Sequence, residues 1–241
     1  MSNPENEQVI RDMNKRFSEA APEEVLSYLL KEYGSELAFS SSLGAEDQVI
    51  THMLAGMDKQ ARIFTLDTGR LFPETLDLLD NTNKRYDISI KVYFPDAARV
   101  EDMVNRKGIN LFYESIKNRK ECCHIRKILP MKRALKGAKV WVSGLRSEQS
   151  VTRKDLALAE WDNNFSLIKI SPLRSWNEKQ VWDFIESNNI PYNKLHDRGF
   201  PSIGCQPCTR AIEPGEDIRA GRWWWELPEM KECGLHTKKK S

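Results

Sequence analysis

Cysteine has the most distinctive chemistry in this 241-residue chain, which contains five of them. Four fall into two close pairs: Cys122 with Cys123, and Cys205 with Cys208. The fifth, Cys233, stands near the C-terminus, with Lys231 before it and His236 after it. Neighbouring cations lower the pKa of a thiol and favour its nucleophilic thiolate form. Cys233 is therefore a candidate nucleophile, and a free surface cysteine is the alternative that its local sequence allows.

The two cysteine pairs offer four thiolates, which suit a structural zinc ion or an iron–sulfur cluster. Zinc sites typically use Cys-x-x-Cys pairs, and only Cys205-Gln206-Pro207-Cys208 has that spacing. Side chains of adjacent residues diverge, so Cys122 and Cys123 reach separate iron atoms of a cluster more readily than one small ion. The spacing favours an iron–sulfur cluster. Zinc, a vicinal disulfide and buried unliganded thiols stay as alternatives.

Several cations stand near these cysteines in the sequence. Lys127 follows Cys123 by four residues, one helical turn, so we expect both side chains on the same face. Arg219 and Arg222 are three residues apart and would form one basic face on a helical turn. The following Trp223-Trp224-Trp225 is interpreted as a packing anchor rather than a surface that stacks nucleic-acid bases. A solvated surface position is the alternative for each cation.

Composition limits the classes of partner and the compartment. The 37 basic and 35 acidic residues give a net charge of +2, which provides no support for binding nucleic acid or a membrane surface. The sequence has neither a signal peptide nor an apolar run long enough for a membrane span, so we expect a cytoplasmic protein. In that reducing compartment, clustered cysteines are more often metal ligands or redox groups than disulfides.

Apolar periodicity predicts alternating strands and helices. Strands are predicted at residues 37–39, 61–67, 88–94, 139–143 and 167–170. Helices are predicted at residues 5–18, 22–33, from 45 onward, 73–85, 97–107, 110–119, from the first cysteine pair to about 137, and 175–188, the last with a capping box from Ser175 to Glu178. This alternation indicates an α/β fold with a doubly wound, mostly parallel sheet. Residues 1–195 would form that domain, and the Gly- and Pro-rich residues 196–241 an arm of it.

Three short segments follow predicted strands, where ligands bind in this class of fold. The loop Ser40-Ser41-Ser42-Leu43-Gly44 leads into a helix, whose N-terminal backbone N–H groups favour an anion such as phosphate. The loop lacks the Gly-Lys-Ser/Thr ending of a Walker A loop, which argues against an ordinary P-loop NTPase. Thr68-Gly69-Arg70 and Gly144-Leu145-Arg146 follow two further strands.

Ordered motifs extend over nearly the whole chain: the loop from Ser40, Leu66-Asp67-Thr68-Gly69-Arg70-Leu71-Phe72-Pro73-Glu74-Thr75, Cys122-Cys123-His124-Ile125-Arg126-Lys127, Gly144-Leu145-Arg146 with Gln149-Ser150-Val151-Thr152-Arg153, Gly204-Cys205-Gln206-Pro207-Cys208-Thr209-Arg210, Gly221-Arg222-Trp223-Trp224-Trp225-Glu226, and Lys231 to His236. With these motifs the chain resembles the assimilatory phosphoadenylyl/adenylyl-sulfate reductases, specifically their iron–sulfur adenylyl-sulfate reductase branch. The resemblance implies an adenine nucleotide alpha hydrolase-like fold.

The resemblance also implies a role for each matching position. Cys122, Cys123, Cys205 and Cys208 would hold a [4Fe-4S] cluster, and Cys233 would be the nucleophile. The phosphosulfate would be surrounded by Lys127, Arg146, Arg219, Arg222 and His236, and the nucleotide pocket lined by Ser40, Ser41, Ser42, Gly44, Thr68 and Gly69. The loop Ser-Ser-Ser-Leu-Gly-Ala-Glu-Asp mixes forms from both branches, so the loop alone does not assign the substrate.

Attack of the Cys233 thiolate on the sulfur of adenylyl sulfate would give S-sulfonated Cys233 and AMP. A second thiol must then attack that sulfonated cysteine to release sulfite. With the other four cysteines committed to metal, the chain has no such thiol and needs an external dithiol, which the resemblance names as thioredoxin or a similar carrier. The alternatives are a reductase that prefers or also accepts phosphoadenylyl sulfate, an ATP-consuming adenylating or sulfur-transferring enzyme, and a zinc-stabilised binding module. The oligomeric state is left open, a homo-oligomer included.

Overall fold

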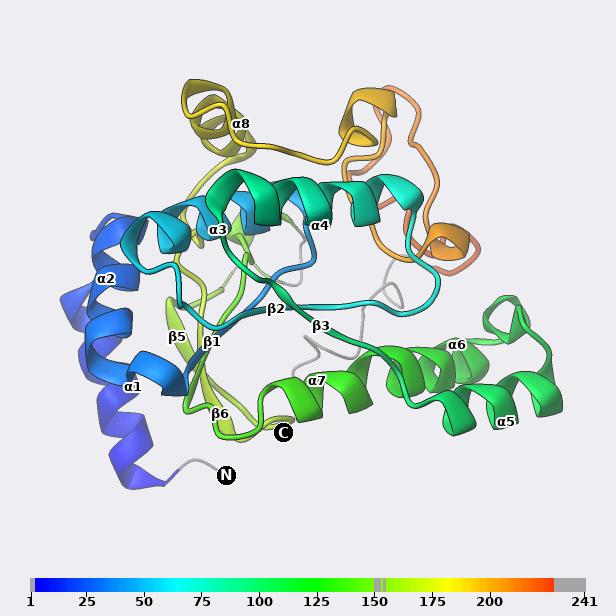
Figure 1. The fold of residues 1–241 in the computed structure, drawn as a ribbon, viewed down its shortest axis with the longest axis horizontal. Coiled ribbons are helices and arrows are strands. Elements are labelled where there is room, and N and C mark those ends of the chain that lie inside the picture. Colours follow the sequence, from blue (N-terminus) through cyan, green and yellow to red (C-terminus); the bar gives the residue numbers. More distant parts are fainter. Residues whose placement is uncertain (1–2, 150–152, 154, 228–241) are drawn as a thin grey trace. The chain divides into compact units, whose positions relative to one another are not determined.

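The computed structural model describes residues 3–149, 153 and 155–227. Helices and strands alternate along this part of the chain (Figure 1): α1 (Pro4–Arg16), α2 (Pro22–Tyr33), β1 (Leu37–Ser40), α3 (Ala45–Met57), β2 (Ile63–Leu66), α4 (Pro73–Tyr86), β3 (Lys91–Tyr93), α5 (Ala97–Lys107), α6 (Ile116–Cys123), α7 (Leu129–Ala134), β4 (Val140–Val142), β5 (Ala159–Asp162), β6 (Leu167–Ile170) and α8 (Glu178–Ser187). A π-helix, His124–Ile128, connects α6 to α7.

Six strands form one sheet in the order β3-β2-β1-β4-β6-β5. Strand β1 is parallel to β2 and β4, and β4 is parallel to β6, whereas β5 is antiparallel to β6. The predicted α/β fold with a mostly parallel sheet is confirmed. Strand β5 was not predicted, because its four residues alternate polar and apolar positions over too short a length to give a clear period.

Two predicted helix boundaries are wrong. The helix predicted at residues 110–119 lies at Ile116–Cys123, so Cys122 and Cys123 form the last two residues of α6, and the predicted helix after them is the π-helix and α7. The capping box lies two residues later than Ser175: the Asn177 side chain accepts from the backbone N–H of Gln180, and the Gln180 side chain accepts from that of Asn177. Residues 171–176 form turns instead, with the Trp176 N–H bonded to the carbonyl of Leu173, so the helix starts after them.

The chain divides into two compact units. Unit 1 comprises Met1–Thr65, Glu74–Lys91 and Gly137–Asn193, and unit 2 comprises Leu66–Pro73, Val92–Lys136 and Lys194–Ser241. The core of unit 1 contains the buried faces of β1, β4 and β6 together with apolar residues of α2, α3 and α8. The described part of the predicted arm, residues 196–227, lies in unit 2 and contains 3-10 turns and one isolated bridge, Thr209 to Arg222.

Unit 2 has a smaller core that contains cysteine. Its buried members are Met103, Leu111, Phe112, Cys205, Cys208 and Trp223. Trp223 is 1% exposed, so the interpretation of the tryptophan triplet as a packing anchor is confirmed for its first member. None of the helices in the described residues combines the length and the hydropathy that a bilayer span requires.

Candidate active site

One pocket of unit 2 brings the four paired cysteines together. It is lined by these cysteines, by the cations Arg70, Arg119, Arg126 and Lys127, and by Phe112, Pro207 and Trp223. Each of the four thiols is free of a disulfide, and three of them are buried. The two cysteine pairs, far apart in the sequence, thus share one site with four positive charges.

The first pair reaches the pocket from the junction of α6 with the π-helix. Helix α6 begins at the N-cap Ser115, whose side chain accepts from the Asn118 N–H, and ends at Cys123. In the π-helix that follows, hydrogen bonds span five residues instead of four, which widens the turn and changes the direction of later side chains. As the four-residue spacing predicts, Lys127 lines the same pocket as Cys123, and Arg126 does so as well.

The second pair lies on a 3-10 turn. Cys205 precedes the turn Gln206–Cys208, and the Cys208 N–H donates to the Cys205 carbonyl at 2.9 Å. Residues three apart lie above one another in a 3-10 turn, so both thiols face the same side. The turn is held by the Gln206 N–H, which donates to the Arg70 carbonyl at 2.8 Å, and by the Tyr113 hydroxyl, which donates to the Pro207 carbonyl at 2.6 Å.

Thr68 and Gly69 lie against this cysteine pocket. The Thr68 hydroxyl is 3.2 Å from the Cys205 sulfur, and the Thr68 carbonyl accepts from Arg126 Nη1 at 2.6 Å. Gly69 has a φ of +69°, and a Cβ there would lie 3.2 Å from Arg126 Nη1. The predicted contact of these two residues with a nucleotide stays a prediction, while their contacts with Cys205 and Arg126 are established.

Four buried thiolates in this pocket would need neighbouring positive charge to stay ionised. Burial, together with a smaller contribution from Cys205, raises the pKa of the Cys208 thiol to about 12. Burial also raises the pKa of Cys122, against a lowering by Arg126 and Lys127. Buried anions need compensating positive charge, which the cations of the pocket supply. Four sulfur donors, free of disulfides and surrounded by cations, therefore fit an anionic metal–thiolate group by their chemistry.

Among the residues that the structure describes, no group of three or more His, Cys, Asp or Glu side chains has the geometry of metal ligands. The predicted [4Fe-4S] cluster accordingly stays a prediction. Its assignment rests on the shared pocket and the donor set.

The predicted cations of the arm lie close together on the chain backbone. Arg219 and Arg222 lie on a single turn, in which the Arg222 N–H donates to the Arg219 carbonyl at 2.9 Å. Arg222 is 8% exposed and donates to the Ile203 carbonyl at 3.1 Å, so the alternative of a solvated surface position does not hold for it. A Cβ on Gly204 would lie 2.3 Å from Arg222 Nη2, so glycine is needed for this close approach.

A buried ion pair ties the end of the described arm to α6. Arg119 donates to both carboxylate oxygens of Glu226, at 2.9 and 2.7 Å, and the two side chains are 1% and 2% exposed. Burial lowers the pKa of Arg119, but the Glu226 carboxylate outweighs it and the pKa is raised overall. The Arg119 guanidinium also lies 4.7 Å from the centre of the Trp223 ring, and Arg222 lies 4.8 Å from it.

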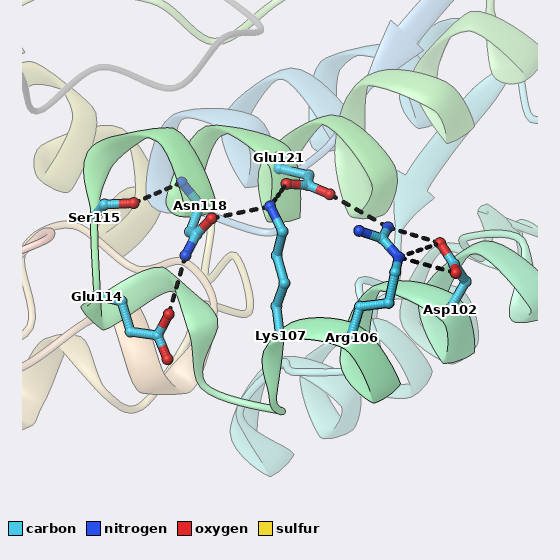
Figure 2. A network of polar contacts seen from close by, with 7 residues as sticks. All are labelled: Asp102, Arg106, Lys107, Glu114, Ser115, Asn118 and Glu121. Atoms are coloured by element: carbon cyan, nitrogen blue, oxygen red, sulfur yellow. Dashed lines mark hydrogen bonds and ion pairs between the residues drawn. The ribbon is translucent and has the colours of Figure 1, made fainter.

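Helix α6 is also braced from α5 by a polar network near the surface, shown in Figure 2. Lys107 forms an ion pair with Glu121, the residue before Cys122, and donates to Asn118 at 3.1 Å. Arg106 lies 3.7 Å from the same Glu121 carboxylate and 2.7 Å from Asp102. The cysteine-bearing end of α6 is thus held by charged side chains from the end of α5.

In unit 1, the loop Ser40–Gly44 is folded around Asp47 at the start of α3. The Ser42 N–H and hydroxyl both donate to Asp47 Oδ2 at 2.6 Å. A Cβ on Gly144 would lie 2.2 Å from Asp47 Oδ1. The segment after β4 therefore approaches the same carboxylate closely. Burial raises the pKa of Asp47 to about 6, against the hydrogen bonds from Ser42, which lower it.

Arg146 is also bound within unit 1. It is 2% exposed, its Nε donates to Glu46 Oε1 at 2.8 Å, and its Nη1 donates to the Trp176 carbonyl at 3.2 Å. Glu46 lies in the first turn of α3, next to the loop. The predicted role of Arg146 at the phosphosulfate stays a prediction, and its contact with the base of the loop is what the structure establishes.

The predicted residues thus fall into two groups. Those in unit 1 are Ser40, Ser41, Ser42, Gly44 and Arg146. Those in unit 2 are Thr68, Gly69, Cys122, Cys123, Lys127, Cys205, Cys208, Arg219 and Arg222. Cys233, with Lys231 and His236, lies outside the described residues.

The sequence over residues 36–211 matches the phosphoadenosine phosphosulfate reductase domain. The chain belongs to this reductase family. An adenosine 5'-phosphosulfate reductase of Allochromatium vinosum is 52% identical over 220 residues, covering 91% of this chain and 86% of that protein. One of Burkholderia cepacia is 48% identical over 220 residues, covering 90% and 88%.

A crystal structure of a phosphoadenylyl-sulfate reductase from Candida auris, in complex with phosphate, has a TM-score of 0.74. It is 27% identical in sequence, and the likeness covers 88% of this chain and 99% of that one. The family indicated by the motifs is therefore confirmed, and so is the adenine nucleotide alpha hydrolase-like fold class with its mostly parallel sheet.

Sequence reasoning missed several residues of both groups in this reductase: Arg70, Phe112, Arg119, Arg126, Glu226 and Asp47. Arg119 stands three and four residues before the first cysteine pair, and Arg126 stands three and four residues after it. Those spacings place side chains on neighbouring positions of a helix, so the signal that singled out Lys127 was available for both arginines. For Asp47 the signal was its place in the first helical turn after a serine loop.

Proposed function

We propose that this chain reduces adenylyl sulfate to sulfite and AMP in sulfate assimilation, through an S-sulfonated Cys233. One observation carries the proposal: four cysteines that form no disulfide share one pocket with four cations. It is found in a chain that is 52% identical to a protein named adenosine 5'-phosphosulfate reductase. On the basis of that relative, adenylyl sulfate is proposed as the substrate of this chain.

Cys122, Cys123, Cys205 and Cys208 would hold a [4Fe-4S] cluster. When bound, this group would supply a compact negative charge beside the pocket cations, and no electrons, because thiol chemistry provides both electrons of the reduction. Arg126 holds the Thr68 carbonyl next to Cys205, and Lys127 lies beside the thiols. These residues would thereby keep positive charge at a fixed place for the substrate.

In the first step, the Cys233 thiolate attacks the sulfur of adenylyl sulfate. A sulfur–sulfur bond forms, the bond from sulfur to the phosphate oxygen breaks, and AMP leaves with the electron pair of that bond. The leaving phosphate gains negative charge, which Lys127, Arg219 and Arg222 would stabilise. Lys231 and His236 are near enough in sequence to help keep Cys233 as its thiolate.

In the second step, a thiolate of an external dithiol carrier attacks the Cys233 sulfur and displaces sulfite. The mixed disulfide that results is resolved by the second thiol of the carrier, which is oxidised to its disulfide while Cys233 is restored. Thioredoxin or a similar protein would serve as this carrier. A reducing compartment such as the cytoplasm, where dithiol carriers are kept reduced, suits both the carrier and the free cysteines.

The decisive experiment is a sulfite-release assay with thioredoxin as the reductant. Adenylyl sulfate should be turned over faster than phosphoadenylyl sulfate, and mass spectrometry without thioredoxin should find one added sulfonate on Cys233. Cys233→Ser should release no sulfite yet keep the brown colour and the broad absorbance near 400 nm that a [4Fe-4S] cluster gives. Sulfite release by Cys233→Ser would refute the mechanism, and a preference for phosphoadenylyl sulfate would reassign the substrate.

A further inference from the structure

A row of side chains from four neighbouring strands crosses one face of the sheet in unit 1. Glu160 of β5 pairs with Lys169 of β6, Lys169 pairs with Trp141 of β4, and Trp141 pairs with Ala38 of β1. Ser40 follows Ala38 by two residues, and residues two apart in a strand lie on the same face. The row therefore ends at Ser40, the first residue of the predicted nucleotide loop.

Contacts along the row fix the Trp141 indole in one orientation. Lys169 Nζ lies 3.1 Å from Glu160 Oε1 and 5.3 Å from the centre of the Trp141 ring. The Phe165 ring meets the same indole edge-on, at 5.5 Å and 85°. Trp141 is 0% exposed and Lys169 is 3% exposed, so neither side chain has room to turn. From this fixed indole, Nε1–H donates to the Ser40 hydroxyl oxygen at 2.7 Å.

This hydrogen bond determines what the Ser40 hydroxyl can do. A serine hydroxyl has one hydrogen to donate, and an indole N–H can only donate, so Ser40 must be the acceptor in this pair. The hydrogen of Ser40 is left for another group, and the described residues offer it no acceptor. Ser40 is half-buried and stands at the carboxyl end of β1, where ligands bind in sheets of this type.

We propose that Trp141 is a positioning residue for the nucleotide: by donating to Ser40, it directs the one hydrogen of the Ser40 hydroxyl toward an acceptor atom of the bound adenine nucleotide. The identity of the ligand rests on the proposed function. A ring nitrogen or an oxygen of the nucleotide satisfies this donor, whereas an amino group at the same place does not. Trp141 thus acts on the ligand through Ser40 without touching it.

The test measures the affinity of the full-length protein, purified with its cofactor, for AMP by calorimetry. Ser40→Ala should weaken binding about five- to tenfold, the factor of one lost hydrogen bond. Trp141→Phe should weaken it by a similar or smaller factor, and the double variant should be no weaker than Ser40→Ala alone. Trp161→Phe is the matched control, because Trp161 follows Glu160 in β5 and lies on the opposite face. Its affinity for AMP should equal that of the wild type.

A second measurement needs no change at Trp141. When AMP accepts the Ser40 hydrogen, the hydrogen bond from the indole is strengthened, so one ¹⁵N-indole N–H resonance should move downfield on AMP binding. The same resonance should fail to move in Ser40→Ala. Additive losses in the double variant, or an unmoved indole resonance in the wild type, would overturn the positioning role while the proposed function stands. A wild type that binds no AMP would overturn both.

Discussion

The predicted nucleotide loop of unit 1 and the cysteine pocket of unit 2 are built in different ways. The loop combines a local contact, since Ser42 and Asp47 are five residues apart, with contacts from one distant segment, from which Trp141 donates to Ser40 over 101 residues. The pocket joins distant segments: Thr68 and Cys205 are 137 residues apart, and Arg119 and Glu226 are 107 apart. Part of the hydrogen bonding of the loop can therefore form with its own strand and helix, whereas the pocket exists only once three separate segments have come together.

Because of this difference, we expect the folding of the pocket to carry a larger free-energy cost than the folding of the loop. Each long-range contact there requires closing a loop of chain, and its charged members are removed from water. The loop buries one carboxylate, Asp47, beside donors from its own segment. Disturbing a buried charge in the pocket should consequently cost more than an equal change at the loop.

The largest effect is expected for the Arg119–Glu226 pair. Glu226→Gln leaves the guanidinium of Arg119 buried without its counter-charge, which should lower the free energy of unfolding by about 3–5 kcal/mol. Urea unfolding measures the loss. The double variant Arg119→Met/Glu226→Leu should recover most of it, because two apolar side chains of similar volume leave no buried charge. A single variant as stable as the wild type would show that the pair does not hold the arm.

Asp47 should give the next largest effect, as a pH dependence. Burial raises its pKa to about 6 from 3.8, so the folded protein binds a proton that the unfolded chain releases. The resulting stabilisation is complete below pH 4 and is lost as the pH rises through 6, a change of about 3 kcal/mol. Asp47→Asn cannot ionise and should lack this dependence.

Unfolding in urea from pH 4 to pH 7 measures that difference between wild type and Asp47→Asn. Asp80→Asn, which removes a carboxylate from an exposed pair on α4, is the control and should keep the wild-type dependence. Parallel pH profiles for the wild type and Asp47→Asn would contradict the predicted proton binding.

Two glycines allow a matched comparison of the regions. Gly144→Ala places a Cβ 2.2 Å from Asp47 Oδ1 and should weaken AMP binding about tenfold, about 1.4 kcal/mol, while the iron content stays unchanged. Gly204→Ala places a Cβ 2.3 Å from Arg222 and should lower the iron content while AMP binding stays within about twofold.

Gly56→Ala is the control for both glycines, because no atom lies within 4 Å of a Cβ at that position. Calorimetry and iron analysis of the three variants provide the measurement. If Gly144→Ala lost iron and Gly204→Ala lost AMP binding, the assignment of the two functions to the two regions would be reversed.

The smallest effect is expected for the surface network in Figure 2. Lys107→Met removes the partner of Glu121, in a pair whose side chains are 27% and 28% exposed. Such a pair contributes about 0.5 kcal/mol, and about 1 M salt should abolish the difference from the wild type. Thermal unfolding at low and high salt checks this. A loss that is large and independent of salt would mean that Lys107 acts by packing.

The sequence predicted what depends on local pattern. The bounds of α2 and α5 were predicted exactly as found, since each has a clear start and a glycine just past its end. The shared pocket of Lys127 and Cys123 followed from spacing alone. In contrast, β5 was missed. It is a strand because it pairs with β6, and a segment of four residues is too short for its apolar periodicity to indicate a strand.

Other features of the site depend on contacts that spacing does not contain. The spacing of Arg119 from the first cysteine pair was a usable signal, but its buried partner Glu226 was not predictable, and neither was the contact of Trp141 with Lys169, which strand register determines. The burial of Arg222 was not predictable from its spacing, because the absence of a side chain at Gly204 is what lets its guanidinium pack inward. Tertiary contacts thus determine the burial of these arginines, whereas the sequence alone shows only that they are charged.

The buried pair of Arg119 and Glu226 also fixes a point of the chain that is close in sequence to the proposed nucleophile. Cys233 follows Glu226 by seven residues, and a chain of that length spans at most about 25 Å. The pair therefore sets an outer limit on where the proposed reaction can take place, because the sulfur of the substrate has to lie within reach of a chain that starts at Glu226.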